Sequence, residues 1–157
     1  MSQEDETGKP WKIGYLLIIM SVVILDQLSK YLVKANHSFG SFPLIDNLIY
    51  ITVVRNTGSA FGMFRNTNFI LIIITIILII FALNYLISSE RKLLGTALSL
   101  IIGGAIGNLI DRIMLGHVLD FIDVNYWPVF NLADLSISIG TAILFYCIIR
   151  AKSKKEK

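Results

Sequence analysis

Four long apolar stretches divide the chain, and polar segments separate each stretch from the next. A helix needs about 20 mostly apolar residues to cross the ~30 Å hydrocarbon layer of a bilayer. The pattern therefore predicts transmembrane helices over about 13–33, 69–87, 93–113 and 129–149. In the second stretch Thr75 is the one polar residue within residues 70–80, which is typical of a helix that faces lipid.

The polar segment between the first two helices is too long for a simple hairpin turn. Its residues 47–54 are rich in β-branched and aromatic side chains, which favours a strand or hairpin on the outer face of the bilayer. We expect residues 1–9 to form a disordered tail. The predicted fold is a single domain over 1–157, an all-α membrane protein of four transmembrane helices with a small extracytoplasmic β-rich segment, about 36–64, between helices one and two.

Composition supports a membrane location, because 55% of the residues are hydrophobic and only 16% are charged. The net charge of +3 does not favour nucleic acid, since most basic residues gather at the flanks of the helices. Cytoplasmic flanks carry the excess of Lys and Arg, and the basic flanks all fall on one side of a four-pass topology. We therefore expect both termini to be cytoplasmic and the chemistry to lie near the outer face. The expected location is a bacterial plasma membrane, although the topology alone does not give the organism. The basic residues of that side are Lys9, Lys12, Arg91, Lys92, Arg150, Lys152, Lys154, Lys155 and Lys157.

Charged residues inside the first helix are the first candidates for a site. Asp26 and Lys30 are four positions apart, so they share one helix face with the carboxylate in the favourable N-terminal position. They could form a partly buried ion pair that seats the helix, or a pair that lines a substrate cavity. Helical spacing alone leaves both interpretations open.

Residues 55–61 combine Asn56 and Gly58 in a polar loop. The Asn amide can both donate and accept hydrogen bonds, which suits a binding site. An ordinary turn is the more common use of these residue types. This segment by itself is therefore weak evidence for function.

The third helix carries a stronger signal near its outer end. Asn108, Asp111 and Arg112 stand at positions i, i+3 and i+4, so a helix places their side chains on one face. Interfacial capping with a snorkelling Arg112 is one interpretation. Three polar groups beside the small residues of 103–107, which allow close helix packing, favour a cavity.

Asp120 and Asp134 are the candidate catalytic pair. Two carboxylates held close can share one proton, so that one accepts a proton from water while the other donates to a carbonyl, as in aspartic peptidases. Both fall at the outer face in the predicted topology. Asp123 is a lower-ranked rival because the residues after it suggest an exposed loop, and Asn131, three positions before Asp134, could orient a carboxylate from the same helical face.

Other chemistries have less support. The chain has two histidines and no His-Glu-x-x-His motif, so we expect neither a metal site nor a cofactor. Intramembrane charges also mark proton-coupled transporters, but here most polar groups lie toward the outer face and the second helix is almost featureless. A non-enzymatic assembly partner remains a third possibility, one that needs no carboxylate chemistry.

Five segments together resemble the bacterial lipoprotein signal peptidases, also called signal peptidase II. They are 26–30 (DQLSK), 55–61 (RNTGSAF), 103–112 (GGAIGNLIDR), 118–121 (VLDF) and 130–134 (FNLAD). The resemblance implies that Asp120 and Asp134 form the catalytic dyad. It also implies that Asp111 is structural and holds Arg112, and that further positions line the site or support the dyad: Asp26, Lys30, Asn56, Gly58, Asn108, Arg112 and Asn131. One departure is the stretch between Asp120 and Asp134, which is short for the family.

The resemblance also implies a substrate and partners. The substrate would be a prolipoprotein whose cysteine already carries a diacylglyceryl group, cleaved just before that cysteine, and the helical leader would enter laterally from membrane lipid. The family further implies a monomer that is inhibited by globomycin. Aromatic and Met side chains of the outer segment are expected to lie on the membrane and cover the substrate: Phe39, Phe42, Phe61, Met63 and Phe64.

Overall fold

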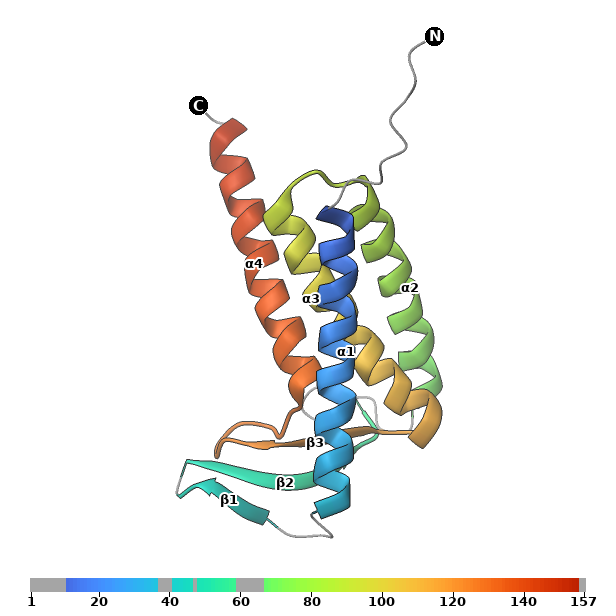
Figure 1. Cartoon of the computed structure of the whole chain (residues 1–157), viewed down its shortest axis with the longest axis vertical. Coiled ribbons are helices and arrows are strands. Elements are labelled where there is room, and N and C mark those ends of the chain that lie inside the picture. The colour runs from blue at the N-terminus through green and yellow to red at the C-terminus, as the bar shows by residue number, and fades with distance from the viewer. Residues whose placement is uncertain (1–10, 37–40, 47, 59–66, 156–157) are drawn as a thin grey trace.

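Four helices form a bundle that carries a small sheet at one end (Figure 1). The computed structural model describes residues 11–36, 41–46, 48–58 and 67–155. Within them all four helices are long and apolar enough to cross a membrane. The helices are α1 (Trp11–Asn36), α2 (Asn68–Ser88), α3 (Lys92–Leu115) and α4 (Leu132–Lys155). The tail predicted over 1–9 lies outside the described residues.

The first three helices extend a few residues beyond the predicted bounds, but the last begins later than predicted. We expected it from 129, whereas α4 begins at Leu132. The reason is local: Phe130 is extended and pairs with Ile122 through backbone hydrogen bonds of 2.8 and 3.0 Å. A residue whose N–H and C=O are engaged in strand pairing cannot also start a helix.

The sheet has three antiparallel strands in the order β1 (Ser41–Ile45), β2 (Ile49–Asn56) and β3 (Val118–Asp123). The strands between helices one and two confirm the predicted β-rich segment. The third strand was not predicted and comes from the chain between α3 and α4. Gly116 ends α3 with a φ of 76°, a left-handed conformation that glycine adopts without strain, and turns the chain into β3.

The helix α3 lies at the centre of the bundle and packs against the other three helices. In the most apolar 18-residue stretch of α3 about 56% is buried inside the protein, against 6% in the corresponding stretch of α2. Small residues permit this packing, as predicted: a Cβ at Gly103 would come within 2.8 Å of Val22 on α1, and one at Gly104 would collide with the carbonyl of Ala133 on α4. The other three helices therefore all pack against α3.

The two ends of the bundle differ in character. The start of α1, the α2–α3 turn and the end of α4 lie together at one end, and the sheet lies at the other (Figure 1). The described basic residues Lys12, Arg91, Lys92, Arg150 and Lys152 all belong to the first end. All the polar clusters singled out from the sequence lie toward the sheet.

Candidate active site

A cavity of about 620 Å³ opens between α2 and α4, with α3 as its floor. Its end next to the sheet holds both predicted catalytic carboxylates, Asp120 from β3 and Asp134 from the first turn of α4. Three further predicted residues line the same end: Asn56, Asn108 and Arg112. The rest of the wall is mostly aliphatic, so the polar groups are concentrated at one end of an apolar groove.

Asp120 is held by two amide groups. Asn56 donates from Nδ2 to one carboxylate oxygen at 2.9 Å, and Asn131 donates from Nδ2 to the other at 2.7 Å. The amide of Asn56 is itself oriented, because its Oδ1 accepts the backbone N–H of Gly58 at 3.0 Å. The segment therefore forms a turn, as one interpretation expected, and the turn directs the Asn56 amide toward the carboxylate of Asp120; a role in binding or catalysis stays a prediction.

Asp120 is only 1% exposed, and this burial determines the acidity of its carboxyl group. The pKa of Asp120 is raised to about 6: loss of hydration is the largest cause and the nearby charge of Asp134 acts in the same direction, while the hydrogen bonds from Asn56 and Asn131 oppose the shift. A carboxyl group with a pKa near 6 can carry a proton at near-neutral pH. That property suits one member of a dyad that shares a proton.

Asp134 is fixed by the way in which α4 begins. Asn131 is the residue just before the helix; its Oδ1 accepts the backbone N–H of Asp134 at 2.9 Å, and its own backbone N–H donates to Asp134 Oδ2 at 3.3 Å. This reciprocal pair is a capping box, which satisfies two donors of the helix terminus. The other oxygen of Asp134 accepts from Nδ2 of Asn108 at 2.8 Å.

Asn131 connects the two carboxylates. Its Oδ1 is engaged by the Asp134 backbone, so its Nδ2 faces Asp120 and Asn108. The prediction that Asn131 lies on the same helical face as Asp134 was wrong, because Asn131 precedes the helix and caps it. Its expected role in orienting a carboxylate agrees with the hydrogen bond to Asp120.

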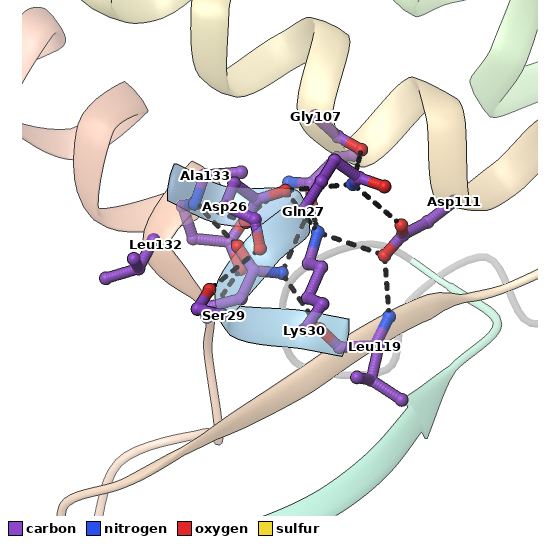
Figure 2. A network of polar contacts seen from close by, with 12 residues as sticks. Asp26, Gln27, Ser29, Lys30, Gly107, Asp111, Leu119, Leu132 and Ala133 are labelled. Atoms are coloured by element: carbon purple, nitrogen blue, oxygen red, sulfur yellow. Dashed lines mark hydrogen bonds and ion pairs between the residues drawn. The ribbon is translucent and has the colours of Figure 1, made fainter. Parts of the chain in front are cut away.

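A buried ionic network joins Asp26, Lys30 and Asp111 (Figure 2). The ammonium of Lys30 contacts Asp26 Oδ2 at 2.8 Å, Asp111 Oδ2 at 2.9 Å and Asn108 Oδ1 at 3.2 Å. All three ammonium donors are therefore used, although Lys30 is only 4% exposed and Asp26 is 0% exposed. Asp26 and Lys30 do not line the cavity, so of the two open interpretations the structure favours the buried ion pair.

Each carboxylate of this network bonds to the backbone of one of the two elements that carry the candidate catalytic aspartates (Figure 2). Asp26 Oδ1 accepts the backbone N–H of Ala133, in the first turn of α4, at 3.0 Å. Asp111 Oδ2 accepts the backbone N–H of Leu119, next to Asp120 on β3, at 3.0 Å. The Lys30 ammonium between them therefore links the first turn of α4 to β3. We expected Asp111 to hold Arg112; its carboxylate instead bonds directly to Lys30, Gln27 and Leu119, and it acts on Arg112 through its charge.

Gln27 belongs to the network but was not predicted to be functional. Its Nε2 lies 3.2 Å from Asp26 Oδ2, 3.0 Å from Asp111 Oδ1 and 3.2 Å from the carbonyl of Gly107. It thus adds neutral donors between two buried carboxylates, as Figure 2 shows. A polar amide next to Asp26 within an apolar helix was the signal that could have identified it.

The remaining candidates occupy distinct places. Arg112 lines the cavity and donates to the carbonyl of Gly58 at 3.3 Å, and its charge interacts with Asp134 and Asp120. Asp123 is not among the cavity residues; it accepts a hydrogen bond from Thr52 within the sheet at 3.1 Å. Among the described residues no group of three or more His, Cys, Asp or Glu side chains could hold a metal ion.

Comparison with known proteins now identifies the family. The profile of signal peptidase (SPase) II matches residues 18–150. The chain belongs to the signal peptidase II family. It is 42% identical over 139 residues to a lipoprotein signal peptidase of Moorella thermoacetica, covering 86% of this chain and 92% of that protein. The protein is thus a membrane peptidase of the family that removes signal peptides from prolipoproteins.

Solved structures agree with this membership in the signal peptidase II family. A bacterial membrane enzyme determined by the in meso method at 2.3 Å matches with a TM-score of 0.86 and 34% identity, over 99% of this chain and 96% of that one. A second, at 1.9 Å, matches with a TM-score of 0.79 and 36% identity, over 86% and 92%. The fold of four helices and a small sheet is therefore that of a known membrane enzyme.

Proposed function

We propose that this signal peptidase II is an aspartic endopeptidase in which Asp120 and Asp134 activate water. The observation that carries the proposal is that the two carboxylates line one cavity and share a hydrogen-bonded neighbour, Asn131. The two residues come from different elements, so their meeting is a property of the fold. Paired carboxylates at the end of an otherwise apolar groove suit hydrolysis of a membrane-embedded peptide.

The chemistry follows from one proton shared by the dyad. The ionised aspartate accepts a proton from a water molecule, whose oxygen attacks the scissile carbonyl, while the protonated aspartate donates its proton to the carbonyl oxygen. Collapse of the tetrahedral intermediate breaks the C–N bond, and a proton passes to the leaving amine. The amides of Asn56 and Asn108 hold the carboxylates during these transfers, and the charge of Arg112 stabilises negative charge at that end of the cavity.

The substrate that suits this cavity is a prolipoprotein whose cysteine carries a diacylglyceryl group, cleaved just before the cysteine. The groove between α2 and α4 is mostly aliphatic, which suits lateral entry of an apolar signal helix from lipid. We further propose that the sheet end faces outward and that the end with Arg91 and Lys92 is cytoplasmic, because cytoplasmic flanks carry the basic excess.

The outer segment supports the same arrangement. Phe42 and Leu44 of β1 are 55% and 62% exposed, so the sheet presents apolar side chains that suit contact with the bilayer surface. The other residues expected to cover the substrate, Phe39, Phe61, Met63 and Phe64, lie outside the described residues. A monomeric state, contact with membrane lipid and inhibition by globomycin stay predictions.

A cleavage assay tests the proposal directly. Purified protein in detergent is incubated with a diacylglyceryl-modified prolipoprotein, and release of the signal peptide is followed by gel shift for wild type, Asp120→Asn and Asp134→Asn. We expect cleavage by the wild type and none by either variant. Asp123→Asn is the matched control, because it removes a neighbouring carboxylate that does not line the cavity, and it should cleave normally.

Thermal unfolding of each variant in detergent separates loss of chemistry from loss of folding. Equal cleavage by all three Asn variants would show that residues other than Asp120 and Asp134 carry out the chemistry. No cleavage by a folded wild-type protein would contradict the peptidase proposal and would favour a transport role for the intramembrane charges.

A further inference from the structure

Two residues with hydroxyl groups line the otherwise apolar part of the groove, one on each wall. Thr75 of α2 and Ser138 of α4 both line the cavity, and Ala105 of α3 lies between them on the floor. Apart from the polar end next to the sheet, the described lining is otherwise made of aliphatic, aromatic and proline side chains. These hydroxyls are therefore the polar features of the deeper groove.

Thr75, Ala105 and Ser138 lie at a similar depth below the proposed catalytic carboxylates. Ser138 follows Asp134 by one helical turn, about 6 Å at 1.5 Å per residue. Ala105 is about 4.5 Å below Asn108, which contacts Asp134. On α2, Asn68 donates to the carbonyl of Arg112 at 3.0 Å, which aligns the outer ends of α2 and α3.

Thr75 lies seven positions after Asn68, about 10 Å along α2, whereas Asn108 is about 6 Å below Arg112 along α3. Thr75 is therefore about 4 Å deeper than Asn108. Thr75, Ala105 and Ser138 together form one layer across the groove, about one helical turn below Asp134.

Neither hydroxyl makes a hydrogen bond with the residues that the structure describes. Other hydroxyls in these helices bond their own backbone: Ser99 donates to Gly95, Thr96 to Lys92 and Ser136 to Leu132. An unpaired hydroxyl in an apolar environment costs free energy. Thr75 and Ser138 thus line the groove with hydroxyl donors that no described residue uses.

A peptide cleaved in this groove has carbonyl groups that require hydrogen-bond donors. Its signal helix must end before the scissile bond, and the last four carbonyls of a helix have no partner within the helix. Within a membrane such groups must be satisfied by the surrounding protein. In extended chain about two residues, at ~3.3 Å each, span the distance from the dyad to this layer.

We propose that Thr75 and Ser138 form a backbone-binding subsite that donates hydrogen bonds to peptide carbonyls two or three residues before the scissile bond. The ligand class is the unwound end of an apolar signal helix, and the small side chain of Ala105 leaves room for its backbone. This assignment rests on the proposed function, because it takes the peptide to run from the dyad down the groove.

The test measures kcat/KM for the diacylglyceryl-modified prolipoprotein with Thr75→Val, Ser138→Ala and the double variant. Loss of one hydrogen bond should lower kcat/KM about three- to tenfold, and the double variant should lose more. Thr75→Ser and Ser138→Thr retain the hydroxyl and should stay within twofold of wild type. Matched controls are Ser21→Ala and Thr141→Val, helical hydroxyls outside the cavity, which should also stay within twofold.

A substrate with an ester in place of the amide between the second and third residues before the cysteine has a weaker acceptor at that position. Wild type should cleave it more slowly, and the double variant should show a smaller penalty. Cleavage within twofold of wild type by the double variant, or equal ester penalties, would overturn the subsite while leaving the dyad intact. Absence of cleavage by wild type would overturn both the subsite and the proposed function.

Discussion

The ammonium of Lys30 lies 3.2 Å from Oδ1 of Asn108, and this contact determines which end of the amide faces the candidate catalytic site. A lysine can only donate hydrogen bonds, so Asn108 must turn its carbonyl toward Lys30 and its NH₂ toward Asp134. A buried charge on α1 thereby orients a donor on α3 toward a carboxylate on α4.

Replacing Lys30 should destabilise the protein strongly. Lys30→Met leaves Asp26 and Asp111 buried without their shared cation, and breaking a buried ion pair by removal of one partner costs about 3–5 kcal/mol. We expect a large fall in the unfolding temperature in detergent. The control is Lys34→Met, at an exposed position near the end of α1, which should change the unfolding temperature little. Similar unfolding temperatures for the two variants would contradict the role assigned to Lys30.

Asn108→Asp should reduce cleavage while preserving side-chain size. The substitution removes the donor to Asp134 and puts a negative charge next to it, whereas the oxygen that faces Lys30 is kept. A hydrogen bond to a charged group contributes about 1.5–3 kcal/mol, which corresponds to tenfold or more in kcat/KM. Steady-state kinetics on the lipidated substrate measures the effect, with the exposed Asn36→Asp as control. Full activity of Asn108→Asp would show that Asp134 does not depend on this donor.

Stability should depend on pH through Asp120. Its pKa rises from 3.8 to about 6 on folding because of burial, so protonation favours the folded state. This contribution is fully present below pH ~4 and is lost as the pH rises through ~6. Between pH 7 and pH 5 the unfolding temperature of wild type should therefore rise relative to that of Asp120→Asn, which lacks the titrating group. Parallel curves for the two proteins would contradict the raised pKa.

Gly107→Ala should destabilise the bundle although alanine is the better helix former. A Cβ at position 107 would lie 2.6 Å from Asp26 Oδ2 and 3.4 Å from the Cβ of Ala133. Overpacking of this kind costs about 1–3 kcal/mol. Gly14→Ala is the control: its Cβ would meet nothing within 4 Å, so it should be neutral or stabilising. Unfolding in detergent compares the two, and equal stability would indicate that α1 and α3 can separate without cost.

The hydrophobic pattern predicted the four helices well, because burial in lipid depends on local composition over about 20 residues. It also indicated Asp120 and Asp134 as candidate site residues, since carboxylates beside apolar helices are costly and therefore conspicuous. The hairpin of β1 and β2 follows from residues close in sequence. The strand β3 was missed because its partner strand lies more than sixty residues earlier, with Val54 opposite Asp120.

The chain by itself thus determined the membrane spans, the polar clusters and the identity of the candidate dyad. Only the tertiary structure decided that α4 begins at Leu132, that Asn131 caps it, and that Asp111 forms an ion pair with Lys30. The contact from Asp26 to the backbone of Ala133 joins positions 107 residues apart, and the one from Lys30 to Asn108 joins positions 78 apart. Local patterns carry no information about such partners, because the contacts exist only after the helices have packed on α3.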